Sequence, residues 1–358
     1  MLYMLWSFLI ACVLAAAVTP LAIKIAPKIG AVDIPKDNRR MHTKPMPRFG
    51  GIAIFAGTIT SLMFFLRNEP GYLGLIIGGS LIYLLGVIDD LKNLSPKIKL
   101  LGQFACASVA YAGGVRILFI TNHFQPGHIF FAGVICYLIT VFWIVGITNT
   151  VNLIDGLDGL AAGISLISSC AIAYAAYIHG YYPATAAMLA IAGGALGFLP
   201  FNFHPAKIFM GDGGSLFLGY MLATVSVVGS VKGSTFVAII VPFLVLGVPI
   251  FDMSFAILRR LINRRPIMEA DKGHIHHRLM AAGFGQRRTV LTIYAIGGTM
   301  GVSAIMLSRD LFMETMGLIG IAAILIYVLL FDDTRRNVTI TARDIEREER
   351  LTKKGDSL

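Results

Sequence analysis

Charged side chains are scarce in this chain. Asp, Glu, Lys and Arg make up 14% of its 358 residues, whereas a soluble domain carries about 25%. Hydrophobic residues make up 56%, so the polar groups are too few to cover a surface that faces water. Length alone would suggest about two or three soluble domains, but no polar domain separates the hydrophobic runs. The composition therefore indicates a protein whose solvent is the lipid bilayer.

Cysteine pairs and a basic N-terminal segment are also lacking. The chain has four cysteines and no Cys-x-x-Cys pair, so we interpret them as small packing residues that carry no information on the redox compartment. Residues 1–18 resemble a secretory signal, but the basic residues Lys24 and Lys28 follow the apolar run instead of preceding it. We expect this run to be retained as the first transmembrane helix.

Apolar runs that could cross a bilayer recur along the chain. A helix needs about 20 apolar residues to span the hydrocarbon core. On this basis we predict an all-α polytopic membrane protein with about 11 transmembrane helices. Several runs are rich in glycine, and small residues let helices approach closely in lipid. The expected spans are 3–23, 50–66, 72–88, 98–115, 131–148, 159–178, 184–201, 214–229, 235–256, 289–307 and 314–331.

The distribution of lysine and arginine predicts the orientation of the chain in the membrane. With these spans, 26 of the 30 Lys and Arg residues fall in alternate connections and the tail. The positive-inside rule makes that side cytoplasmic, so we expect the N-terminus outside and the C-terminus in the cytoplasm. Residues 1–331 would form a single transmembrane catalytic domain, and 332–358 a charged cytoplasmic tail. The expected cytoplasmic loops are 24–49, 89–98, 149–158, 202–213 and 257–288. The net charge of +10 mostly reflects this bias and is no sign of nucleic-acid binding.

The first acidic cluster ends the third span. Asp89 and Asp90 stand where the helix dipole disfavours anions, so a positive group should compensate. Mg²⁺, which prefers oxygen ligands, Lys97 and Lys99 are candidates. A pair of solvated helix-end acids is the simpler interpretation.

The second cluster lies between spans five and six. It holds two Asp-Gly steps, at Asp155 and Asp158, and two amides, Asn149 and Asn152. Glycine allows backbone conformations that other residues avoid, so we expect a compact turn with four oxygen-bearing side chains. Asx turns and a helix cap are the structural alternative. The density of acid beside an apolar run favours a functional site.

The third cluster lies between spans seven and eight. It contains Asn202 and Phe209 and ends in Gly211-Asp212-Gly213-Gly214-Ser215. A glycine-rich helix start offers N–H groups for phosphate, and Asp212 offers a carboxylate for a metal. A helix cap with flexible glycines would leave the same pattern, so this loop alone is a weak signal.

Two basic segments complete the cytoplasmic side. Three histidines, His274, His276 and His277, precede Arg278 in the loop 257–288. They could suggest zinc, but no cysteine or further histidine completes such a site. Phosphate binding fits better because Arg matches phosphate geometry, and a basic patch on the membrane surface is the alternative. The other segment ends at Arg48, whose charge could meet phosphates or simply stop translocation.

Carboxylates, amides, histidines and arginines thus converge on one membrane face. This composition fits Mg²⁺-assisted handling of a diphosphate, because in phosphoryl transfer the protein mostly positions groups and neutralises charge. A transporter would place ionisable residues near the bilayer midplane, often on broken helices. The acids here stand at the ends of spans, so transport is the disfavoured alternative.

Four ordered motifs carry a resemblance that runs from the first span to the last. They are Asp89-Asp90 with Asn93 and Lys99-Leu100-Leu101-Gly102-Gln103; Asn149-x-x-Asn152-x-x-Asp155-Gly-x-Asp158-Gly-Leu; Asn202-x-x-Pro205-Ala206-x-x-Phe209-Met210-Gly211-Asp212-x-Gly-Ser215; and His274-x-His276-His277-Arg278-Leu279. They resemble the motifs of the polyprenyl-phosphate N-acetylhexosamine-1-phosphate transferases. The last is similar to the bacterial branch that uses N-acetylglucosamine (GlcNAc) and initiates teichoic acids or O-antigen-type polymers. The phospho-N-acetylmuramoyl-pentapeptide branch tends to carry three consecutive histidines followed by Phe-Glu, and usually has ten spans.

The resemblance implies a reaction. GlcNAc-1-phosphate would move from UDP-GlcNAc to undecaprenyl phosphate, giving undecaprenyl-diphospho-GlcNAc and UMP at the cytoplasmic face of a bacterial membrane. Mg²⁺ would be the cofactor, with Mn²⁺ as a substitute, and a homodimer is compatible with the family. UDP-MurNAc-pentapeptide or another UDP-N-acetylhexosamine is the alternative donor.

The resemblance also implies residue roles. Asp212 would be the principal Mg²⁺ ligand, helped by Asp90 and Asn152, and Phe209 would stack on uracil. Asp89 would assist direct attack by the lipid phosphate, or a carboxylate would attack first and form a covalent intermediate. Asn152, Asp155, Asp158 and Asn202 would hold nucleotide or metal. The catalytic residues would be Asp89, Asp90, Asp155, Asp158, His276 and His277. The substrate-binding residues would be Asn93, Lys99, Asn149, Asn152, Asn202, Phe209, His274, Arg278 and Arg48.

Overall fold

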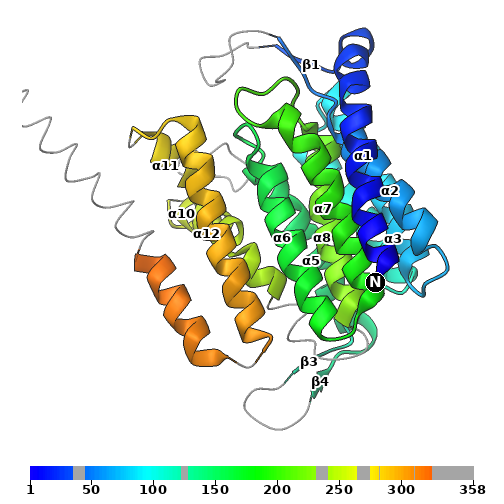
Figure 1. The fold of residues 1–358 in the computed structure, drawn as a ribbon, viewed down its shortest axis with the longest axis vertical. Coiled ribbons are helices and arrows are strands. Elements are labelled where there is room, and N and C mark those ends of the chain that lie inside the picture. Colours follow the sequence, from blue (N-terminus) through cyan, green and yellow to red (C-terminus); the bar gives the residue numbers. More distant parts are fainter. Residues whose placement is uncertain are drawn as a thin grey trace, which may run out of the picture.

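The chain folds into a helical bundle with two short strand pairs (Figure 1). The computed structural model describes residues 1–34, 45–121, 128–230, 241–263, 275–281, 283–309 and 311–324. Strand β1 (Val32–Asp33) pairs antiparallel with β2 (Met46–Pro47), and β3 (Phe119–Thr121) with β4 (His128–Phe130). The labelled helices are α1 (Leu2–Ile25), the 3₁₀ helix η1 (Ala26–Ile29), α2 (Gly51–Phe65), α3 (Tyr72–Lys92), α4 (Pro96–Ala112), α5 (Gly133–Ile154), α6 (Leu160–Ile178), α7 (Tyr182–Asn202), α8 (Gly211–Ser230), α10 (Gly247–Ile262), α11 (Ile275–Ala281) and α12 (Gln286–Leu307).

The polytopic membrane class is supported by the apolar helices. Among the described residues, seven helical segments are long and apolar enough to cross a membrane: Leu2–Ile29, α3, α5, α6, α7, Gly211–Val228 and α12. Two shorter apolar helices are α2 and Phe312–Ile324. The expected span 98–115 falls short of this standard, because α4 has 17 residues and carries Lys97 and Lys99 near its start.

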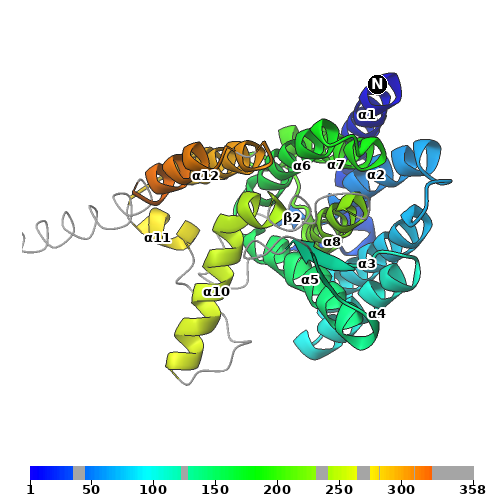
Figure 2. The ribbon, with the colours of Figure 1, turned by 90° about the horizontal axis from the view of Figure 1, so that it is seen from below.

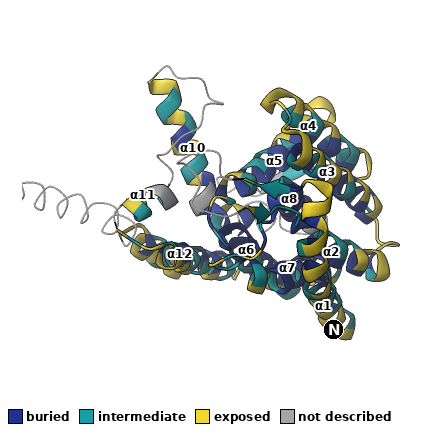
Figure 3. Ribbon diagram, turned by 90° about the horizontal axis from the view of Figure 1, so that it is seen from above, coloured by how far each residue is buried: buried dark blue, intermediate teal, exposed yellow. Residues whose placement is uncertain are grey.

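Helix α8 lies at the centre of the bundle. Helices α2, α3, α5, α6 and α7 all contact it, and Figure 3 shows it enclosed among them. A Cβ at Gly86 of α3 would lie 2.5 Å from the carbonyl oxygen of Asp212. Only glycine therefore lets α3 come so close to the start of α8. This close approach brings the acids of both helices to one end of the bundle.

The glycine-rich part of α7 packs closely against its neighbours, as small residues in lipid should. A Cβ at Gly194 would lie 3.2 Å from the carbonyl oxygen of Ile54 in α2. About two turns earlier on α7, the Ser7 hydroxyl of α1 donates to the carbonyl of Ala186 at 2.9 Å. Helices α1, α2 and α7 therefore form one tightly packed wall of the bundle.

Helix α10 leaves the direction of the bundle and extends sideways from it (Figure 2). The chain begins a new helix at Gly247, and Pro249 lies in its first turn, where proline is tolerated. Phe251, Phe255 and Leu258 are exposed along it. In its described part, the expected span 235–256 is interrupted by a turn at Leu246, before α10 begins, while 235–240 lie outside the described residues.

The connections gather at two opposite ends of the bundle. Strand β1 and helix α11 lie at one end, and β3, β4 and the N-terminus lie at the other (Figure 1). The acidic clusters fall at the end that carries β1, as the grouping of loops predicted. The candidate site is built there.

Candidate active site

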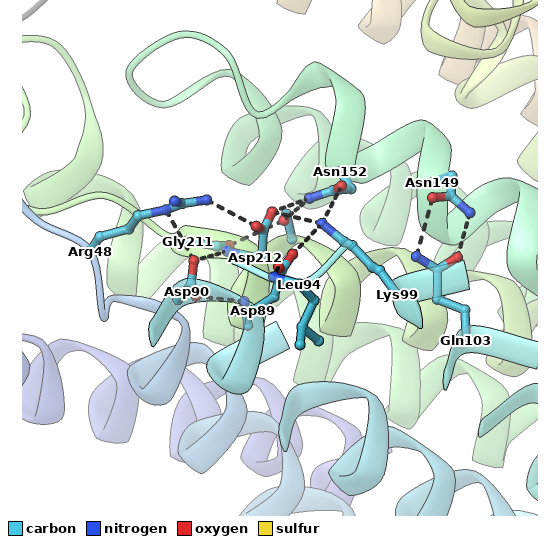
Figure 4. A network of polar contacts seen from close by, with 12 residues as sticks. Arg48, Asp89, Asp90, Leu94, Lys99, Gln103, Asn149, Asn152, Gly211 and Asp212 are labelled. Atoms are coloured by element: carbon cyan, nitrogen blue, oxygen red, sulfur yellow. Dashed lines mark hydrogen bonds and ion pairs between the residues drawn. The ribbon is translucent and has the colours of Figure 1, made fainter. Parts of the chain in front are cut away.

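Asp212, in the first turn of α8, is the centre of a polar network (Figure 4). Its Oδ1 accepts a hydrogen bond from Asn152 Nδ2 at 2.7 Å and lies 3.2 Å from Lys99 Nζ. Its Oδ2 accepts a hydrogen bond from Arg48 Nη2 at 3.0 Å. The side chain stays 18% exposed, so this firmly held carboxylate can still be reached by a ligand. The Asp212 network comprises Arg48, Asp89, Asp90, Lys99, Asn152 and Asp212.

Asp90 caps the start of α8 from the end of another helix. Its Oδ1 accepts the N–H of Asp212 at 2.8 Å, and its Oδ2 accepts the N–H of Gly213 at 3.0 Å. Arg48 Nε lies 3.0 Å from Oδ1, and the Asp90 side chain is 2% exposed. The first N–H groups of a helix lack partners within it, and its dipole favours an acid there. The contacts thus give Asp90 the task of positioning Asp212, which sequence reasoning had not foreseen.

Asp90→Asn should loosen the start of α8. The amide NH₂ would face a backbone N–H, so one hydrogen bond is lost together with the charge that pairs with Arg48. We expect a loss of about 1–2 kcal/mol, the range for a helix cap, and faster amide exchange at Asp212 and Gly213. Hydrogen exchange by mass spectrometry measures this, with Glu69→Gln, an exposed acid at the other end of the bundle, as the control. Unchanged exchange at α8 would show that Asp90 does not hold it.

Asp89, one residue earlier, faces Lys99 instead of α8. Its Oδ2 lies 2.9 Å from Lys99 Nζ, and its Oδ1 accepts the N–H of Leu94 at 2.7 Å. Asn93 ends α3 with a φ of 50°, a left-handed conformation that turns the chain back so that Leu94 can reach Asp89. Lys99 also donates to Asn152 Oδ1 at 3.2 Å. Lys99 is therefore the positive group that Asp89 was expected to need, and Arg48 supplies the positive charge for Asp90.

Asn149 and Asn152 lie on α5 and not in a turn. The helix continues to Ile154, so the prediction of a loop over 149–158 was wrong for its first part. The reason is that Val151 and Ile154 are buried and extend the apolar face of the helix. Asn152 points to Asp212. Asn149, one turn earlier on α5, exchanges hydrogen bonds with Gln103 of α4 (Figure 4).

Asp155 follows α5 and stands apart from the ion pairs. Its carboxylate makes no hydrogen bond or ion pair within the described residues. Burial, and then the nearby Asp212 carboxylate, raise the pKa of Asp155 to about 7. A carboxylate held without a partner beside a second one is a place that a cation would stabilise.

Asp158 and Asn202 bind the segment between α7 and α8. Asp158 Oδ2 accepts a hydrogen bond from His204 Nδ1 at 2.8 Å. Asn202 accepts the N–H of Gly159 at 3.1 Å and donates to the carbonyl of Ile208 at 2.9 Å. The turn after α5 and the segment 203–210 are therefore fixed to each other, and His204 is a member of this site that no motif had singled out.

Phe209 joins the site to the chain before α2. Its N–H donates to the carbonyl of Pro47 at 2.8 Å, and its carbonyl accepts the N–H of Gly50 at 2.9 Å. These two hydrogen bonds hold the backbone on either side of Arg48 against the segment that precedes α8, so the Arg48 side chain reaches Asp212.

The histidine motif is only partly described. Arg278 is exposed on α11 and makes no hydrogen bond or ion pair with the described residues. His274 and the side chains of His276 and His277 lie outside the described residues. The role of these four residues stays a prediction.

Asp212 and Asp155 together fit a magnesium ion. Mg²⁺ commonly uses one or two protein carboxylates and takes its other ligands from water and substrate phosphates. Within the described residues no group of three or more His, Cys, Asp and Glu side chains is arranged around a metal. The carboxylate of Asp155, which has no hydrogen-bond or ion-pair partner among the described residues and whose pKa is raised by burial and by Asp212, is the feature that favours a cation.

Comparisons with known proteins identify the family. Residues 72–230 match the model described as glycosyl transferase family 4. Over 302 residues the chain is 46% identical to a Bacillus subtilis protein named probable undecaprenyl-phosphate N-acetylglucosaminyl 1-phosphate transferase, and the match covers 84% of each chain. The chain belongs to glycosyl transferase family 4. The family predicted from the four motifs is thereby confirmed.

Other members of glycosyl transferase family 4 are also similar to this chain. It is 37% identical over 311 residues to decaprenyl-phosphate N-acetylglucosaminephosphotransferase of Mycobacterium tuberculosis, covering 78% of this chain and 76% of the relative. It is 31% identical over 318 residues to phospho-N-acetylmuramoyl-pentapeptide-transferase of Bacillus subtilis, covering 84% and 95%. The family range 72–230 contains every member of the Asp212 network except Arg48.

Proposed function

We propose that the protein transfers GlcNAc-1-phosphate from UDP-GlcNAc to undecaprenyl phosphate and releases UMP. The observation that carries the proposal is the Asp212 network, which sets a carboxylate between Lys99 and Arg48 at one end of a membrane bundle. The 46% identity to a relative named for this activity supports GlcNAc as the sugar. The reaction would be the first membrane step of a cell-wall or surface polymer such as a teichoic acid.

The site would face the cytoplasm, where UDP-sugars are made. The bias of 26 of the 30 Lys and Arg residues toward one side supports this orientation. In this arrangement about 11 helices span the cytoplasmic membrane, with the N-terminus outside and the tail inside.

Four members of the Asp212 network, together with Asp155, would bind the donor, hold the metal or position a ligand. Lys99 and Arg48 would bind the oxygens of the donor diphosphate, since a cation pair suits a dianion and Arg matches phosphate geometry. Asp212 and Asp155 would hold Mg²⁺, which supplies positive charge to the diphosphate and to the departing UMP. Asp90 would keep Asp212 in place through the start of α8.

Direct attack by the lipid phosphate is the mechanism that we propose. A phosphate monoester is largely ionised at neutral pH, because its second pKa is about 6, so it needs no strong base. An oxygen of the lipid phosphate bonds to the β-phosphorus, and the bond from that phosphorus to the bridging oxygen breaks and releases UMP. Both oxygens of Asp89 are engaged, one by Leu94 and one by Lys99, which suits a positioning role better than that of a nucleophile.

Release of UMP from alternative donors tests the proposal. Purified protein in detergent, with Mg²⁺ and undecaprenyl phosphate, would be given UDP-GlcNAc or UDP-MurNAc-pentapeptide in parallel. We expect Mg²⁺-dependent and lipid-dependent release from UDP-GlcNAc alone. Release from the pentapeptide donor alone would move the protein to the branch of its 31% identical relative, and UMP release without lipid would favour a covalent intermediate.

The affinity for Mg²⁺ should rise with pH. Because the pKa of Asp155 is raised to about 7, this carboxyl holds a proton at lower pH and must lose it before it binds a cation. The Mg²⁺ concentration that gives half-maximal rate should therefore fall from about pH 6 to about pH 8. Asp155→Asn should bind Mg²⁺ weakly with little of this dependence. An equal pH dependence in wild type and variant would assign it to the lipid phosphate instead.

A further inference from the structure

A histidine outside the Asp212 network holds one of the predicted site carboxylates. His204 Nδ1 lies 2.8 Å from Asp158 Oδ2, and the same oxygen accepts the N–H of Ala206 at 3.1 Å. An ionised carboxylate only accepts hydrogen bonds, so Nδ1 is the donor. The resemblance already implies that Asp158 holds nucleotide or metal. We infer that His204 is a positioning residue, which fixes Asp158 so that its other oxygen binds an N–H or O–H group of the donor nucleotide sugar. This inference rests on the proposed function.

The two oxygens of Asp158 have different surroundings. Oδ2 is anchored twice, whereas Oδ1 makes no hydrogen bond within the described residues. The side chain is 16% exposed, so a ligand can reach it. An anchored carboxylate with one oxygen left over has the form of a binding group, because its orientation is settled before the ligand arrives.

The anchor itself is held by the scaffold. The carbonyl of His204 accepts a hydrogen bond from Arg287 Nε, at the start of α12, at 3.0 Å. The N–H of Lys207 donates to the carbonyl of Phe201 in α7 at 2.8 Å. These hydrogen bonds hold the backbone around His204 against α7 and α12. The His204 side chain can therefore restrict the orientation of Asp158.

The charge of Asp158 selects the part of the donor that it can bind. A carboxylate repels the diphosphate, which the cations Arg48 and Lys99 suit better. The remaining parts of a UDP-sugar are the base, the ribose and the sugar, and these carry N–H and O–H donors. Asp158 would therefore bind one of these uncharged parts.

Two amide variants separate the role of the Nδ1 atom from the presence of the ring. The side-chain NH₂ of asparagine stands close to the position of Nδ1, and that of glutamine close to Nε2. His204→Asn should therefore keep the bond to Asp158, and His204→Gln should lose it. We expect the KM for UDP-GlcNAc to rise about tenfold in His204→Gln, the effect of one hydrogen bond to a charged group, and to change little in His204→Asn.

Three further readouts distinguish positioning from a structural role. The kcat and the KM for undecaprenyl phosphate should stay within about twofold of wild type in His204→Gln. The reason is that the hydrogen bond between His204 and Asp158 is proposed to affect only the binding of the donor. In an Asp158→Ala background, His204→Gln should add no further loss, since its partner is gone. Calorimetry with UMP and with UDP-GlcNAc then assigns the contact: weaker UMP binding points to the base or ribose, and weaker binding of UDP-GlcNAc alone points to the sugar.

Several results would overturn the inference. Equal losses in His204→Asn and His204→Gln with a lower thermal midpoint would mean that the ring only packs. A fall in kcat at unchanged donor KM, or additive losses with Asp158→Ala, would also exclude it. If wild type binds UDP-GlcNAc and both variants match it, this inference alone fails. If wild type does not bind UDP-GlcNAc, the proposed function fails and the inference falls with it.

Discussion

Asp212→Ala should abolish turnover while the protein stays folded. The substitution removes the carboxylate that would hold Mg²⁺ and leaves the donor diphosphate without its counter-charge, so we expect a loss of at least about 10³-fold in kcat. Arg48 keeps Asp90 as a partner at 3.0 Å, and Lys99 keeps Asp89 at 2.9 Å. The two cations are therefore not left buried without an acid, and the bundle should retain its thermal midpoint within a few degrees.

The assay for Asp212→Ala is UMP release at saturating donor and Mg²⁺, with thermal unfolding in the same detergent. Glu69→Ala is a suitable control, because Glu69 is an exposed acid in the connection between α2 and α3. It should have wild-type activity. Wild-type activity in Asp212→Ala itself would remove Asp212 from the centre of the site.

Lys99→Met should cause the second large loss. Lys99 Nζ lies 2.9 Å from Asp89, 3.2 Å from Asp212 and 3.2 Å from Asn152 Oδ1. Without it, two carboxylates lose the cation that they share, and the donor diphosphate loses one of its proposed binding groups. We expect kcat/KM for UDP-GlcNAc to fall about 10²-fold. Lys99→Arg should restore little, because a planar guanidinium does not match the compact ammonium.

Lys97 provides a matched control for this variant. It lies two residues earlier on α4 and is exposed, so Lys97→Met removes the same charge at the same end of the bundle. Its kcat/KM should stay within about twofold of wild type, as for a surface charge. If Lys97→Met and Lys99→Met lose activity equally, the effect comes from net charge near the membrane and not from the Asp212 network.

The sequence predicted which residues meet but not how they pair. Asp89, Asn152 and Asp212 come from loops assigned to one face, and the structure brings them together as expected. Pairing across helices depends on where side chains of different elements point, and no periodicity carries that information. Sequence reasoning therefore treated Asp89 and Asp90 as one acidic pair, whereas one faces Lys99 and the other caps α8.

Helix boundaries were predicted less well than the membrane class. Hydropathy placed most spans, because the run of apolar residues is itself the physical requirement. It placed Asn149 and Asn152 in a loop, since two amides in an apolar helix look unfavourable until their partners Gln103 and Asp212 are known. Hydropathy also could not predict the direction in which α10 runs, because that direction depends on how α10 packs against α5 and α12.

The most direct test of the proposed reaction follows the β-phosphorus of the donor. UDP-GlcNAc radiolabelled at that atom would be incubated with the purified protein, Mg²⁺ and undecaprenyl phosphate, and the lipid and nucleotide products separated. Transfer of GlcNAc-1-phosphate predicts that the label enters the lipid in a one-to-one ratio with GlcNAc and that UMP is the nucleotide released. Label that remains in released UDP, with GlcNAc alone on the lipid, would contradict the account.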